Sequence, residues 1–173
     1  TGVTLEVGKG YAVVEVLGGK DEPGTDILSI IRQYDLPEEF SKGARRQARS
    51  LKGPDGDAIA RREDLRGKTI ITIDGADAKD LDDAVSLTPL QCGNMLVGVH
   101  IADVSAYVPQ GGLLDREAYA RGTSVYLLDR VVPMFPPELS DGVCSLSSGT
   151  DKLALSLFME VNKQGRVIRH RFS

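Results

Sequence analysis

The feature that most constrains this chain is a group of aspartates placed directly after an apolar run. Asp74, Asp80, Asp82 and Asp83 fall within ten residues, and they follow residues 69–73, whose apolar character is typical of a strand. Each carboxylate is ionised at neutral pH, and neighbouring like charges raise the pKa of a carboxyl group and cost free energy. We therefore expect these side chains to surround a cation or to spread over an exposed acidic turn.

Among possible binding partners, such a cluster suits a hard divalent cation best. Mg²⁺ takes carboxylate oxygens, usually from one or two carboxylates, and completes its shell with water or substrate phosphates. The glycine at position 75 and its small neighbours keep the alternative of a solvated acidic turn open. A calcium loop does not fit, because counting from Asp80 puts Ala84 and Val85 where an EF-hand needs a ligand and a glycine. The spacing thus indicates a candidate metal site for phosphate chemistry.

Composition and charge are those of a soluble globular protein. Apolar residues make up 41% of the 173 residues and charged residues 27%, which allows one medium domain or two small units. The net charge of −4 argues mildly against simple RNA binding, since nucleic-acid-binding proteins are usually basic. Basic residues nevertheless gather in residues 42–52, 61–68 and 166–171. Such stretches fit a path for phosphates leading to a metal site, and they also fit an ordinary solvated surface.

The cysteines, the lengths of the apolar runs and the N-terminus indicate the cellular compartment of the protein. Cys92 and Cys144 are far apart and form no C-x-x-C pattern, so we expect reduced thiols and neither a zinc site nor a disulfide. No run approaches the ~18 apolar residues of a membrane span, and no signal peptide is visible. These features predict a cytoplasmic protein with no membrane partner. The chain lacks an initiator Met, which suggests a fragment or a processed product.

The order of the predicted elements favours an α+β fold with a mixed β-sheet and flanking helices. Strands are expected between residues 4 and 17. A helix follows that Thr25 or Asp26 can cap, and it ends before Pro37. Its expected apolar stripe consists of Ile27, Ile30, Ile31 and Tyr34. A second helix is expected over residues 38–51, with a common face formed by Phe40, Ala44, Ala48 and Leu51. Residues 57–68 are polar and without a clear period, and we interpret them as a linker.

From residue 68 onward the sequence changes to β character. Strands are expected over residues 69–73, 84–87, 96–101, 153–161 and 165–172, with a hairpin turn joining the last two. One helix is expected over residues 113–120. Residues 131–137 contain three prolines and cannot form a regular helix.

The aspartate segment, residues 72–85, closely resembles the signature of the ribonuclease II / ribonuclease R family. This signature lies in the RNB catalytic domain of processive 3′-to-5′ exoribonucleases. Further segments that resemble the family are residues 97–108, 121–127, 131–140 and 153–156. Upstream, residues 23–31 resemble the link between the second cold-shock (OB) domain and the RNB domain. The resemblance predicts the end of an OB-fold over residues 1–22, a helical linker over 23–67 and the N-terminal half of an RNB domain over 68–173.

The resemblance also implies roles for individual residues. Asp74, Asp80, Asp82 and Asp83 match the four active-site aspartates, which hold Mg²⁺ and position the attacking water; Mn²⁺ could replace Mg²⁺. Tyr126 matches an aromatic residue that stacks on a base near the 3′ end of single-stranded RNA. Without the resemblance, its position between two apolar residues would favour core packing for Tyr126.

Two further residues near these positions are not assigned a catalytic role. Asp77 lies outside the matched set of aspartates, and we expect it to face solvent. His100 alternates with apolar residues in a predicted strand, so we expect it to have a structural role.

The activity implied by the resemblance is Mg²⁺-dependent, hydrolytic 3′-to-5′ degradation of single-stranded RNA to nucleoside 5′-monophosphates. Two alternatives stay open: a non-catalytic RNA-binding relative or fragment, and a metal-dependent hydrolase of another phosphate ester. The family's RNB domain is longer than the portion present here, and its later half carries an essential arginine. We therefore expect this piece alone to bind metal weakly and to hydrolyse RNA poorly or not at all.

Overall fold

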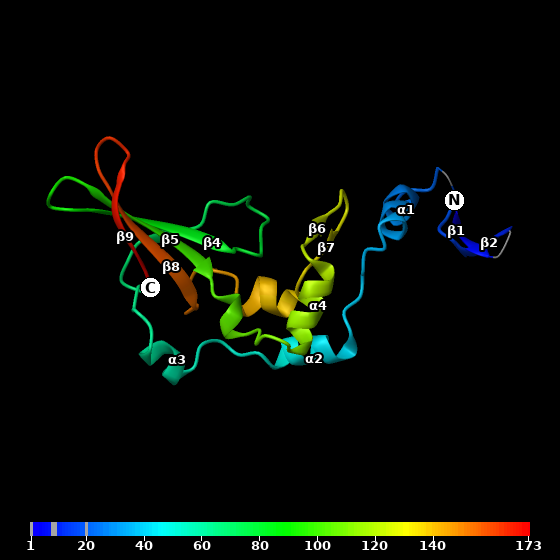
Figure 1. Cartoon of the computed structure of the whole chain (residues 1–173), viewed down its shortest axis with the longest axis horizontal. Helices are drawn as coiled ribbons and strands as arrows, with labels where there is room; N and C mark the ends of the chain where they lie inside the picture. The colour runs from blue at the N-terminus through cyan, green and yellow to red at the C-terminus, as the bar shows by residue number, and fades with distance from the viewer. Residues whose placement is uncertain (1, 8–9, 20) are drawn as a thin grey trace.

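The computed structural model describes residues 2–7, 10–19 and 21–173 of the chain. Thr1, Gly8, Lys9 and Lys20, which fall in the segment expected to end an OB-fold, lie outside the described residues. Figure 1 shows a hairpin of β1 (Gly2–Val7) and β2 (Gly10–Val16) at one end of the molecule and a larger sheet at the other. Helices lie between them, and the candidate site belongs to the end that carries the larger sheet.

Helix α1 (Thr25–Gln33) ends ahead of Pro37, as its sequence predicts. Its N-terminal cap is Gly24, with a φ of 86°, and not Thr25 or Asp26. A left-handed backbone favours glycine at this position, and Asp26 instead lies in the first turn of the helix. The predicted apolar stripe is only half buried, since Ile27 and Ile31 are buried whereas Ile30 and Tyr34 are exposed.

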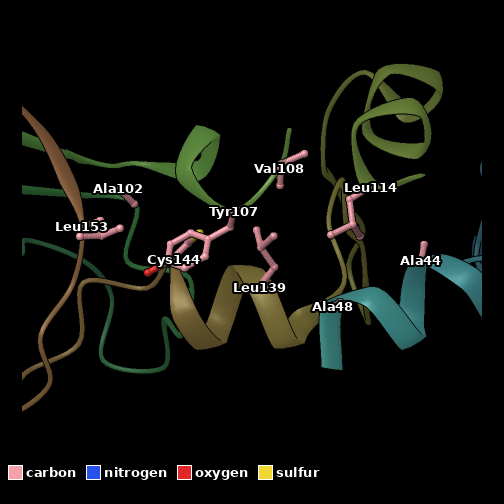
Figure 2. Close-up of a cluster of buried hydrophobic side chains, with 9 residues drawn as sticks. All are labelled: Ala44, Ala48, Ala102, Tyr107, Val108, Leu114, Leu139, Cys144 and Leu153. Carbon is pink, nitrogen blue, oxygen red and sulfur yellow. The ribbon is translucent and has the colours of Figure 1, made fainter. Parts of the chain in front are cut away.

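Helix α2 (Lys42–Ser50) is shorter than predicted, because Ser41 begins it by accepting a hydrogen bond at its Oγ from the Ala44 amide at 3.1 Å. Its predicted apolar face is confirmed for Ala44 and Ala48, whereas Phe40 lies ahead of the helix and Leu51 is its C-terminal cap. The side chains of Ala44 and Ala48 pack in a hydrophobic cluster with Leu114 of helix α4 (Leu113–Arg121). Figure 2 shows this cluster continuing through Leu139 to the residues at the edge of the sheet.

The larger sheet has five strands in the order β3-β4-β5-β8-β9. The strands are β3 (Ile70–Ile71), β4 (Asp83–Pro89), β5 (Met95–Ala102), β8 (Ala154–Val161) and β9 (Val167–Phe172). Every pair of neighbours in it is antiparallel, so the α+β class is confirmed while the strand directions are not mixed. The run at residues 69–73 forms a strand only at its centre, because the chain leaves the sheet before the first aspartate.

Several elements have no clear signal in the sequence. The expected linker contains a short helix, α3 (Gly56–Ala60), whose first turn is capped by the Asp55 carboxylate accepting from the Ala58 amide at 2.7 Å. Strands β6 (Val125–Tyr126) and β7 (Val131–Val132) form a two-residue hairpin ladder. A kinked π-helical segment, η2 (Glu138–Val143), follows the proline-rich stretch. Two-residue strands and a single irregular turn are too short to produce a hydrophobic period.

His100 is structural, as its position in an apolar strand predicts. Its ring is buried in β5, with Nε2 3.0 Å from the Ser86 hydroxyl and Nδ1 2.9 Å from the Ser156 hydroxyl. These two serines lie on the neighbouring strands β4 and β8. Burial lowers the pKa of His100, which favours the neutral imidazole. The side chain therefore bridges three strands and has no part in the acidic cluster.

Cys92 is exposed, Cys144 is buried, and both are free thiols. Burial raises the pKa of the Cys144 thiol to about 11, so this sulfur is protonated and unreactive at neutral pH. None of the helices in the described ranges has the length and apolar character that crossing a bilayer requires.

Candidate active site

The four aspartates lie along the connection from β3 to β4. Residues 72–82 form a loop in which the Ala78 amide donates to the Gly75 carbonyl at 3.0 Å, making a turn. Asp83 is the first residue of β4 and pairs with Ile101 of β5. The acidic cluster therefore lies at the end of the sheet, at the point where the chain re-enters it.

Asp82 is the centre of this cluster in electrostatic terms. Desolvation of its carboxyl raises the pKa of Asp82, and the carboxylates of Asp80, Asp83 and Asp74 raise it further, in that order. Asp77 is exposed, as predicted, and makes no contribution to this shift. The structure thus brings the four matched aspartates into one neighbourhood and leaves Asp77 outside it.

Tyr126 reaches the cluster from β6. Its hydroxyl donates a hydrogen bond to Oδ2 of Asp80 at 2.9 Å, and the side chain remains 67% exposed. The hydrogen bond to Asp80 raises the pKa of Tyr126, and the Asp141 carboxylate contributes to the same shift. Core packing, which the flanking apolar residues alone favour for Tyr126, is therefore not what the structure has. The residue is exposed to solvent, and its hydroxyl contacts a carboxylate of the cluster. Asp141, in η2, is a further neighbour of the site, and no sequence motif predicted it.

The acidic loop is attached to two other segments of the chain. Ser145 is buried, and its hydroxyl donates to the carbonyl of Lys79 at 2.6 Å and accepts from the amide of Leu81 at 3.3 Å. The Ala102 amide, at the end of β5, donates to the carbonyl of Asp82 at 2.9 Å. The sequence did not predict a role for Ser145, because it lies in a stretch that also contains Ser147 and Ser148 and nothing local distinguishes it.

The donor set suits a hard cation, since all four candidate ligands supply carboxylate oxygens. Within the described residues, however, no three His, Cys, Asp or Glu side chains are arranged so that together they could hold one metal ion. The geometry is therefore not that of a closed protein cage. A cation at this site would have to take one or two carboxylates and fill its remaining positions with water or phosphate oxygens, as Mg²⁺ often does in proteins.

The arginines of the basic stretches are mostly engaged with carboxylates. Arg49 pairs with Glu138 at 3.0 Å, and Arg171 pairs with Glu63 at 2.7 Å. The other ion pairs of these stretches are Arg45–Glu39, Arg62–Asp103, Arg66–Asp64, Arg66–Asp151 and Arg169–Glu160. This pairing favours an ordinary charged surface for these arginines over a path of free cations leading to the site.

Comparison with known protein families gives two matches. The RNB domain matches residues 62–173, which is well over half of the chain, and the cold shock domain model CSD2 matches residues 10–41. Ribonuclease R of Thermotoga maritima is 52% identical over 162 residues, covering 91% of this chain and 23% of that protein. Ribonuclease R of Escherichia coli K12 is 41% identical over 171 residues, covering 98% of this chain and 20% of that protein. The chain thus spans about a fifth to a quarter of the length of these relatives.

Solved structures agree with the sequence matches. Mycoplasma genitalium RNase R in complex with double-stranded RNA superposes with a TM-score of 0.86 at 30% identity, over 94% of this chain and 29% of that one. Yeast Ssd1, a pseudonuclease, shares the fold with a TM-score of 0.77 at 21% identity, over 94% of this chain and 21% of that one. The chain belongs to the RNB domain family, and it carries part of an RNB domain preceded by a cold-shock segment.

Proposed function

We propose that the protein containing this chain is a Mg²⁺-dependent, hydrolytic 3′-to-5′ exoribonuclease that degrades single-stranded RNA to nucleoside 5′-monophosphates. The observation that carries the proposal is the contact between Tyr126 and Asp80, which holds an exposed aromatic ring at the edge of the carboxylate cluster. An exposed ring offers a stacking platform for a base of any identity, and in this proposal the phosphate of that nucleotide is cut at the adjacent carboxylates.

The chain's own residues have distinct tasks in this proposal. Asp74, Asp80, Asp82 and Asp83 share two tasks, with one or two of their carboxylates on the cation and the others orienting the attacking water, and Tyr126 aligns the terminal base. When bound, Mg²⁺ supplies charge neutralisation at the phosphate and a water of lowered pKa. In this proposal the hydrogen bond from Tyr126 restrains the Asp80 carboxylate before substrate arrives, which reduces the ordering that binding requires.

The proposal is tested with RNA labelled at either end. The protein is incubated with 3′-labelled or 5′-labelled single-stranded RNA in Mg²⁺, in Mn²⁺ or in EDTA, and Asp82→Asn is compared with wild type. We expect metal-dependent shortening from the 3′ end that releases labelled mononucleotide. The Asp82→Asn variant should lose this activity while it retains RNA binding. Cleavage that persists in EDTA, or that starts at the 5′ end, would contradict the proposal.

A second candidate is a non-catalytic RNA-binding protein, because yeast Ssd1 shows that this fold exists in a pseudonuclease. The same experiment separates the two functions. RNA that is bound with unchanged length in every metal would establish the binding protein. The intact set of four aspartates, Asp82 with three neighbouring carboxylates, favours the nuclease, since a binding surface for RNA gains nothing from clustered negative charge.

A further inference from the structure

One buried oxygen holds the loop that carries the aspartates. Ser145, which directly follows Cys144 at the end of η2, is only 1% exposed. Its Oγ donates to the carbonyl oxygen of Lys79 and accepts from the amide of Leu81, over 2.6 Å and 3.3 Å. A hydroxyl has one donor and acceptor lone pairs, so serine makes both bonds at once. The two bonds close around Asp80, the residue between Lys79 and Leu81.

The same stretch of backbone is fixed at two more points. The amide of Leu146 donates to the carbonyl of Leu81 at 2.8 Å, and the amide of Ala102 donates to the carbonyl of Asp82 at 2.9 Å. These two bonds join backbone to backbone, so they survive most substitutions. The bonds of Ser145 come from its side chain, so a point substitution removes them selectively.

We propose that Ser145 is a positioning residue that sets the places of the Asp80 and Asp82 carboxylates for the cation and the RNA phosphate. This inference rests on the function proposed above. Groups that orient metal-binding side chains typically change metal affinity or activity by ~10–100-fold when they are removed. A displacement of ~1 Å at a reacting centre can cost ~100-fold in rate. When the Ser145 hydroxyl is removed, the Lys79 carbonyl and the Leu81 amide lose their hydrogen-bond partner. The loop around Asp80 is then free to shift.

A purely structural role for Ser145 is the competing explanation, and the chain offers a matched control. Ser156 is 2% exposed and also makes a buried side-chain hydrogen bond, to Nδ1 of His100 at 2.9 Å. It lies in β8 and bonds to no residue of the acidic loop. Ser145→Ala and Ser156→Ala therefore each remove one buried hydroxyl, but only the first releases the loop.

The experiment uses the longest natural polypeptide that contains this chain. For wild type, Ser145→Ala and Ser156→Ala, we would measure kcat and KM on single-stranded RNA, the Kd for Mn²⁺ by electron paramagnetic resonance without RNA, and the Tm. Hydrogen exchange of the Leu81 amide reports the loop directly. For Ser145→Ala we expect kcat to fall about tenfold or more, the Mn²⁺ Kd to rise about tenfold and Leu81 exchange to accelerate, with KM within about twofold of wild type. For Ser156→Ala we expect a lowered Tm with unchanged kcat and Mn²⁺ affinity.

Two outcomes overturn the inference. One is a folded Ser145→Ala protein with the kcat and Mn²⁺ affinity of wild type. The other is an equal loss of Mn²⁺ affinity in Ser156→Ala, which would point to general destabilisation. If Ser145→Ala does not fold, Ser145→Cys takes its place, because its thiol is larger than a hydroxyl, leaves no cavity and is a weaker hydrogen-bonding group. A wild-type protein without nuclease activity would contradict the proposed function. Mn²⁺ affinity and hydrogen exchange of the Leu81 amide would still decide whether Ser145 positions the carboxylates.

Discussion

The hydroxyl of Tyr126 donates a hydrogen bond to Oδ2 of Asp80, so an exposed aromatic ring is tied to a carboxylate 46 residues earlier in the chain. The ring and the hydroxyl make separable contributions. In the proposed function the ring offers a face to a base, whereas the hydroxyl restrains Asp80. Substitutions at Tyr126 can therefore distinguish base stacking from the placement of the carboxylate.

Replacing Tyr126 by Ala should weaken RNA binding, whereas Phe should preserve it. Stacking on an aromatic ring contributes ~1–3 kcal/mol per base, so we expect Tyr126→Ala to raise the Kd for single-stranded RNA by ~5–150-fold. Tyr126→Phe keeps the ring and loses only the bond to Asp80, and its Kd should stay within about twofold of wild type. Fluorescence anisotropy in EDTA measures both without turnover. Equal weakening by Phe and Ala would show that the ring does not act as a stacking platform.

Replacing Asp82 by Asn should slightly stabilise the metal-free protein. The carboxylates of Asp80, Asp83 and Asp74 crowd the charge of Asp82, and a neutral amide relieves that repulsion. We expect the Tm in EDTA to rise or stay constant, and the stabilisation of wild type by added Mg²⁺ to be largely lost in the variant. Asp77→Asn is the control, since this exposed residue lies outside the cluster and should leave both quantities unchanged. A clear fall in the Tm of Asp82→Asn in EDTA would contradict crowding among the carboxylates.

The ion pair between Glu63 and Arg171 should make stability depend on acidic pH. The hydrogen bonds from Arg171 lower the pKa of Glu63 to about 2, below its ordinary value of 4.5. A carboxyl whose pKa is lowered by folding stabilises the protein above its unfolded pKa, and this contribution is lost as the pH falls from about 4.5 toward 2. Both side chains are partly exposed, so we expect less than ~1 kcal/mol.

The measurement is the free energy of unfolding of wild type and Glu63→Gln in urea between pH 7 and pH 3. The difference between the two proteins should be largest at pH 7 and shrink as the pH falls. It should also shrink in 1 M NaCl, because salt screens an exposed ion pair. A difference that grows at low pH would rule out this ion pair as its origin.

Replacing Arg121 by Lys should destabilise the protein. The Arg121 guanidinium donates to the backbone carbonyls of Pro37, Glu39 and Pro133 at 2.6, 2.8 and 3.0 Å, and it stacks 3.7 Å from the ring centre of Phe40. A lysine ammonium cannot reproduce this planar fork or its stacking on Phe40. Water can reach the exposed carbonyls of Pro37 and Glu39, so the cost comes mainly from the part-buried Pro133 carbonyl and the lost stacking, about 1 kcal/mol.

We expect chemical denaturation to show a loss of about that size for Arg121→Lys. Arg116→Lys, at an exposed position of the same helix, should change stability by less than ~0.5 kcal/mol. Equal effects of the two substitutions would mean that the carbonyl contacts of Arg121 do not contribute to stability.

The sequence alone was sufficient for much of the fold. Alternating and helical periods placed β4, β5 and β8, as well as α2 and α4, to within a few residues, because each of these elements buries part of its surface. Strand β9 was also predicted, although all of its residues are exposed, because a hairpin turn precedes it. The same patterns failed for β6, β7 and η2, which are too short to show a period. They also predicted too long a strand before Asp74, since an apolar composition does not reveal where a chain leaves its sheet.

For the candidate site, the density of charge in residues 74–83 was enough to single out the aspartates and to predict that they influence one another. The charge density could not show that Tyr126 is exposed and contacts Asp80. Nor could it show that Ser145 binds two residues of the loop that lie 64 and 66 positions earlier in the sequence. Spacing reports which side chains share a strand or a helix. Contacts between distant segments depend on the path of the chain between them, and that path is decided only when the separate elements pack against one another.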